Sequence, residues 1–159
     1  MDVKVKDIDE IRRFGSSVKS FLSDYLGGLS RVGSMADSDR SKASNFLSSM
    51  RNRADSAERD LRSAERMLED AERKARNSES DLSDQVEYAQ RIVDDRMAKY
   101  ELAKRTLNEA EGLVRKILTN TEMVQDEVRR GNYQLRTVGS EALQAISKSL
   151  TRISQYLSR

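Results

Sequence analysis

The sequence predicts an all-α protein, an elongated antiparallel helical bundle with a long central coiled-coil hairpin and two terminal helices packing at one end. Two observations carry this prediction. From Leu47 to Ile117, apolar residues recur at alternating steps of three and four, the spacing of a coiled-coil seam. Pro, Trp and Cys are absent, and only 5% of residues are aromatic while 35% are charged, which suits long helices with narrow apolar faces.

The chain of 159 residues has the length of one ordinary domain, so we expect a single domain over residues 1–159. Within it, the periodicity and the positions of helix-ending residues predict four helices. They span residues 7–33, 38–76, 80–130 and 135–157.

The first helix should begin at Asp7, because Asp7 and Glu10 have the spacing of a capping box. Its apolar row is predicted to comprise Ile8, Ile11, Phe14, Val18, Phe21, Leu22, Tyr25, Leu29 and Val32. Gly27 and Gly28 interrupt this row and together cost roughly 2 kcal/mol in a helix interior. We therefore expect a kink or an early end there, unless the two glycines admit another helix closely. The small and polar residues 33–41 predict the first turn.

The second and third helices carry the central seam, and their other faces alternate acids and bases. Pairs such as Asp55 with Arg59 place the acid four residues before the base, which supports helicity and solubility. Between the helices, Asn77 could adopt the left-handed conformation of a helix C-cap, and Ser78 with Asp81 repeats the capping-box spacing. We expect the chain to reverse here. One uninterrupted helix is the competing interpretation.

The third helix should stop near Gly131, and a fourth amphipathic helix should follow. The bulkiest apolar side chains lie in the first and last helices, so these two are expected to complete a four-helix core at one end of the hairpin. Any that the core leaves uncovered are candidates for partner binding. The candidates are Ile146, Leu150, Ile153, Phe21 and Tyr25.

The composition argues against most chemistry. With neither His nor Cys, the chain lacks the usual general base, the thiolate nucleophile and the common zinc ligands, so we expect no catalytic, cofactor-binding or metal-binding residues. A net charge of +2 with both signs interspersed is unlike a nucleic-acid interface, and no small-molecule substrate is expected. Arg96 is the one polar residue within the seam; either its head group reaches solvent past Met97 or it meets a buried partner.

The opening pattern Val-x-x-Ile-x-x-Ile-x-x-Phe, from Val5 to Phe14, resembles the small helical-hairpin proteins of the WxG family. The helix, small-residue turn and second helix that follow share that layout, although the chain has no Trp and hence no Trp-x-Gly motif. The resemblance implies that the protein is a substrate or partner of type VII secretion. The layout is similar to a longer version of that architecture, in which a charged hairpin is inserted between the terminal helices.

Taken together, the sequence predicts a non-enzymatic interaction or scaffold protein, a WxG-like partner or adaptor in a secretion- or toxin-linked system. Its partners would be proteins, including further copies of itself. The alternative is a peripheral membrane protein whose first helix lies in lipid. No signal-peptide core and no membrane-spanning run is visible in the sequence, so we expect a cytoplasmic protein, or one exported without a cleavable signal peptide.

Overall fold

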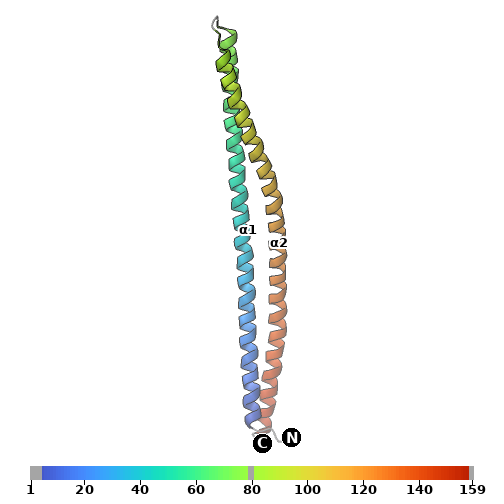
Figure 1. Ribbon diagram of the computed structural model, residues 1–159. Coiled ribbons are helices and arrows are strands. Elements are labelled where there is room, and N and C mark those ends of the chain that lie inside the picture. Colours follow the sequence, from blue (N-terminus) through green and yellow to red (C-terminus); the bar gives the residue numbers. More distant parts are fainter. Residues whose placement is uncertain (1–4, 79–80, 158–159) are drawn as a thin grey trace. The chain divides into compact units, whose positions relative to one another are not determined.

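A computed structural model describes residues 5–78 and 81–157 of the chain (Figure 1). Helix α1 comprises 72 residues, Val5–Arg76, and helix α2 comprises 75 residues, Ser83–Leu157. Over these described ranges there is no strand, and the two helices pack together. The prediction of an all-α protein is therefore confirmed.

The structure has two long helices where the sequence predicted four. Helix α1 passes without a break through Gly27, Gly28 and the expected turn at residues 33–41, and α2 passes through Gly131 and Asn132 in the same way. No described residue has a positive φ, so these glycines are ordinary helical residues. A helical glycine costs about 1 kcal/mol relative to alanine. This cost is small beside the packing of the apolar residues before and after each glycine, which explains why the helices continue.

Contacts divide the chain into two compact units, and each is described by itself. Unit 1 comprises residues 1–38 and 120–159, and unit 2 comprises residues 39–119. In each unit a segment of α1 lies beside a segment of α2 (Figure 1). We call the row of side chains at which the two helices meet the seam.

In unit 2 the seam is lined mainly by small and branched apolar residues. Leu61, Ala64 and Val93 form its buried cluster, with Leu68, Ile92 and Tyr100 packed against them. Further buried seam residues are Ala43, Met50, Ala54, Ala89, Ala110 and Val114. Most of these are alanines, which let helix axes approach closely. Arg51 in α1 and Glu111 in α2 form an ion pair of 3.2 Å beside the seam.

One predicted seam residue of α2, Ile117, is instead 40% exposed. Arg96 is half-buried between Val93 and Tyr100, at the seam position that the sequence predicted for it, and its neighbour Met97 is exposed. After Val114 the half-buried row takes an extra step of four to Leu118, so Ile117 turns away.

In unit 1 the seam is built by setting small residues against branched ones. A Cβ placed on Gly15 would lie 3.2 Å from Ile146 Cγ2, and one on Gly33 would lie 3.5 Å from Val128 Cγ1. The arrangement is reversed at Gly131, whose Cβ would lie 3.3 Å from Leu29 Cδ1. The closest approach is at Gly139, where a Cβ would lie only 2.5 Å from the nearest atom of Leu22.

The expected four-helix core of bulky residues does not form. Phe14, Phe21 and Tyr25 are 62%, 61% and 53% exposed, and Val32 is 45% exposed. The reason is that residues 8–36 of α1 carry two neighbouring apolar rows, whereas the described part of unit 1 contains one other helical segment to cover them. The seam takes Ile8, Ile11, Gly15, Val18, Leu22, Leu26, Leu29, Gly33 and Ala36.

The helices end and begin close to the predicted reversal. Helix α1 stops at Arg76, as expected, and the amide of Asn77 donates to the carbonyl oxygens of Arg73 and Lys74. Asn77 does not adopt the predicted left-handed conformation, since it can make these bonds with negative φ. The predicted start of the next helix at Ser80 lies outside the described residues, and α2 begins at Ser83. The described residues 77, 78, 81 and 82 are not helical, so the competing interpretation of one uninterrupted helix is excluded.

Replacing Gly139 by alanine should destabilise the protein, whereas Gly27→Ala should stabilise it. Leu22 occupies the space into which the new methyl group at residue 139 must go, and overpacking of this kind costs about 1 to 3 kcal/mol. Nothing lies within 4 Å of a Cβ at Gly27, so alanine there gains about 0.5 to 1 kcal/mol of helix propensity. Urea unfolding followed by circular dichroism measures both. A stabilised Gly139→Ala variant would contradict the close approach to Leu22.

The Asp81 carboxylate should stabilise the start of α2 in a pH-dependent way. Its Oδ1 accepts a hydrogen bond of 2.9 Å from the Ser83 amide, and the hydrogen bonds from Ser83 lower the pKa of Asp81 below its ordinary value. A lowered folded-state pKa means that the stabilisation is present above the unfolded-state pKa and disappears as the pH falls through the folded-state pKa.

Titration of the Asp81 carboxyl carbon by NMR measures that pKa directly. In Asp81→Asn, which keeps the acceptor oxygen and loses the titrating proton, the protection factor of the Ser83 amide against hydrogen exchange should not change over the same acid range. An Asp81 pKa at or above its ordinary value would contradict the proposed bond.

Candidate functional site

Apart from the buried Thr121 and half-buried residues such as Arg96, the polar side chains in the described part of the chain lie at the surface. There, no three His, Cys, Asp or Glu side chains gather as a metal site would require. The pKa of Asp95 is lowered chiefly by a hydrogen bond of 2.6 Å from Lys99 Nζ, one helical turn away. This is an exposed ion pair of the kind that supports a helix.

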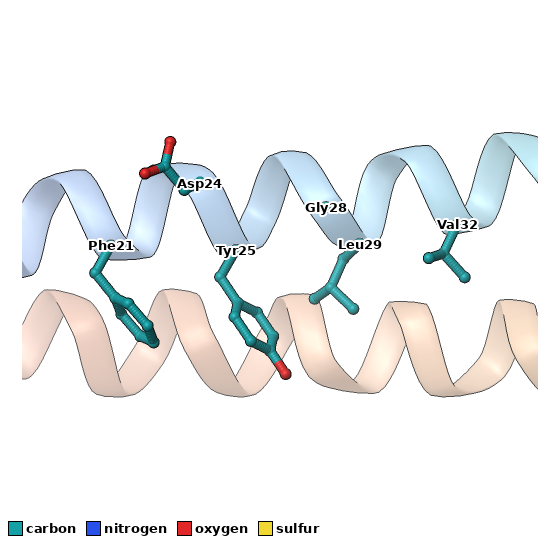
Figure 2. Close-up of a pocket in the computed structure, with 6 residues that line it drawn as sticks. All are labelled: Phe21, Asp24, Tyr25, Gly28, Leu29 and Val32. Carbon is teal, nitrogen blue, oxygen red and sulfur yellow. The ribbon is translucent and has the colours of Figure 1, made fainter.

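An apolar groove on α1 is the strongest candidate for a functional site. It is lined by Phe21, Asp24, Tyr25, Gly28, Leu29 and Val32, and it has a volume of about 440 Å³. Figure 2 shows the side chains of Phe21, Tyr25, Leu29 and Val32 on the same side of α1, toward α2, and Asp24 on the opposite side. The groove therefore lies along the α1 segment of unit 1 and not at a helix end.

The groove exists because glycine stands between large side chains. The rings of Phe21 and Tyr25 lie 5.9 Å apart between centroids and are inclined at 38°. Beyond them Gly28 contributes no side chain, and nothing lies within 4 Å of the position that its Cβ would occupy. The floor at Gly28 is consequently backbone, and the aromatic rings and Val32 form the walls.

The sequence predicted five partner-binding residues, and the structure does not bring them together as one surface. Phe21 and Tyr25 line the groove and are mostly exposed. Ile146, Leu150 and Ile153 are half-buried on α2, and Ile146 contacts α1 at Gly15. Ile146 hence belongs to the seam of unit 1.

The sequence prediction missed Gly28, Leu29 and Val32 as parts of one site. The signal was present, because residues 21, 25, 28, 32 and 35 are separated by steps of four and three. This second apolar row runs beside the seam, and the two rows were interpreted as one. The prediction that Gly27 and Gly28 admit another helix fails within this chain, since nothing in the described residues lies within 4 Å of either Cβ position.

No described helix contains a stretch that is both long and apolar enough to cross a membrane. Comparison of the chain with protein-family models, with curated proteins and with solved structures finds no match.

The neighbours Phe21 and Leu22 should respond differently to truncation. Phe21→Ala should cost less than about 1 kcal/mol of unfolding free energy in dilute solution, because its ring is 61% exposed. Leu22→Ala should cost about 2 kcal/mol or more, because Leu22 fills the space above Gly139. Urea unfolding at low protein concentration measures both losses. A larger loss for Phe21→Ala would mean that its ring is buried.

Proposed function

We propose that the protein is a non-enzymatic interaction or scaffold protein, an antiparallel coiled-coil hairpin that presents the apolar groove of α1 to a protein partner. The groove is the observation that carries the proposal. Contiguous exposed apolar side chains commonly mark binding sites, and aromatic residues such as Phe21 and Tyr25 are frequent anchors in protein interfaces.

Contacts within each unit support the antiparallel arrangement. In unit 1, Gly33, Leu22 and Gly15 of α1 lie against Val128, Gly139 and Ile146 of α2, so residue numbers fall along one helix as they rise along the other. Gln125 also donates a hydrogen bond to Asp37. In unit 2, Arg51 pairs with Glu111, whereas Leu61 and Ala64 cluster with Val93, which is the same order.

The charges of unit 2 support a structural role for that part. Arg62 with Glu58, Arg91 with Glu87 and Lys99 with Asp95 form ion pairs one turn apart on the same helix. Exposed pairs of this kind contribute about 0.2 to 1 kcal/mol each and occupy the charges that a partner would otherwise meet. We infer that unit 2 acts as a spacer and keeps the protein soluble, and that unit 1 binds the partner.

The lining of the groove supports binding and not catalysis. Asp24 and Tyr25 are its titratable side chains, and Asp24 points away from the other lining side chains (Figure 2). Acid–base catalysis requires titratable groups that converge on one place. The secretion-linked setting implied by the resemblance to WxG proteins stays a prediction.

Exposed Phe14, Phe21 and Tyr25 also favour the alternative, in which α1 lies on a membrane surface. Co-sedimentation with anionic phospholipid vesicles separates the two functions. We expect the chain to stay in the supernatant, because Asp24 borders the groove and opposes an anionic surface.

A pull-down from native lysate tests the proposed function. The chain carrying Phe21→Ala and Tyr25→Ala should lose its protein partners, whereas a chain carrying Arg59, Arg62 and Arg73 to Gln in unit 2 should keep them. Circular dichroism checks that both variants remain helical, and mass spectrometry identifies the retained proteins. Binding lost from the arginine set and kept by the groove set would mean that recognition runs along unit 2.

A further inference from the structure

We propose that a second copy of this chain occupies the groove, with the α1 helices of the two copies packed antiparallel along their exposed rows. This inference rests on the proposed function and names the partner. This row, called the exposed row, comprises the exposed Phe14, Phe21, Tyr25, Val32 and Met35 together with the half-buried Gly28 and Val18, the latter of which also borders the seam.

The spacing of the row fits another helix. From Val18 to Met35 the steps alternate between three and four, which is the repeat that a helix of a coiled coil presents to its neighbour. The seam residues Leu22 and Leu29 stand one position after Phe21 and Gly28 and pack on α2. Helix α1 thus carries two adjacent apolar rows, of which α2 covers one.

Side-chain size selects an antiparallel alignment. When Tyr25 of one copy is set opposite Gly28 of the second copy, Phe21 comes opposite Val32 and Val18 comes opposite Met35. Two-fold symmetry repeats each of these contacts, as a closed dimer requires. The phenol ring then enters the space above Gly28, where nothing lies within 4 Å of the Cβ position. A parallel alignment in register would instead set Gly28 against Gly28 and leave a void there.

Charges at the rim favour the same alignment. Asp24 and Arg31 are seven residues apart and directly precede Tyr25 and Val32, so they flank the row on one side of α1. Figure 2 shows Asp24 on the side away from α2. The ion pairs found among the described residues involve neither side chain. The antiparallel alignment brings Asp24 of each copy near Arg31 of the other, which gives two ion pairs with complementary charge.

The exposed area is also of the right order. An aromatic side chain buries about 150 to 250 Å², and Phe21 and Tyr25 are more than half exposed, so each offers about 100 Å². Two copies then bury about 400 Å² from these aromatic rings alone. Val32, Met35 and the aliphatic stems of flanking residues add to this, toward the roughly 1,200 to 2,000 Å² of a stable interface.

Sedimentation equilibrium over a range of protein concentrations tests the inference with the full chain. Asp24→Arg and Arg31→Asp should each weaken dimerisation on the order of tenfold or more, because each creates like-charge contacts. The double variant Asp24→Arg/Arg31→Asp restores opposite charges and should return to within about threefold of the original dissociation constant. A double variant as weak as the single ones would overturn the antiparallel alignment.

The adjacent glycines supply a matched pair of variants. Gly28→Leu fills the groove and should abolish dimerisation, whereas Gly27→Leu lies off the row and should leave it unchanged. Both positions have open space around the Cβ, so both variants should fold, as circular dichroism would verify. Equal effects of the two substitutions would overturn the assignment of the groove.

A chain that is monomeric at every concentration would overturn self-association. It would leave the proposed function standing if the Phe21→Ala/Tyr25→Ala chain still loses its partners in the pull-down. Sedimentation with anionic phospholipid vesicles by a monomeric chain would assign the row to a membrane surface and would overturn both proposals.

Discussion

The contact on which this protein depends is the narrow seam along which α1 meets α2 in each unit. Two helices can shield only one face of each other, so no side chain among the described residues is completely buried. Small residues allow the two helices to pack closely across this thin layer. Ala64 and Ala110 are each only 3% exposed, and in unit 1 the glycines receive Ile146, Val128 and Leu22. Close approach thereby takes the place of a thick core.

The same constraint separates what could be predicted from the sequence and what could not. The seam of unit 2 could be predicted because each helix there has one apolar row with charged neighbours, which leaves one face to bury. Leu61 and Ala64 belong to the row of α1, and Val93 belongs to the row of α2. The end of α1 at Arg76 could also be predicted, because the phase of the apolar row changes just beyond it. Local pattern and packing agree at these places.

The packing of unit 1 could not be predicted in the same way, because periodicity does not say how many helices will be present to cover the apolar rows of α1. Phe21 and Leu22 both fit a heptad row, and the choice between them was decided by the small residue Gly139 on α2. The prediction of a kink or helix end at the paired glycines was wrong for a related reason. Gly27 and Gly28 have a modest local cost, while the apolar rows on either side continue across them. The groove at Gly28 depends on both facts and became visible only with the helix intact.

A seam made of repeating layers, with no central core, also bears on how such a chain can change its length. Each layer contacts mainly the layers before and after it, as in repeat proteins. In unit 2, loss of seven residues from α1 together with the seven that face them on α2 would remove whole layers and leave the remaining rows aligned. Loss from one helix alone would draw Arg51 past Glu111 by about two turns and misalign every layer between the deletion and an end of the pair. Insertions and deletions in relatives of this protein should therefore occur as compensated pairs of heptads.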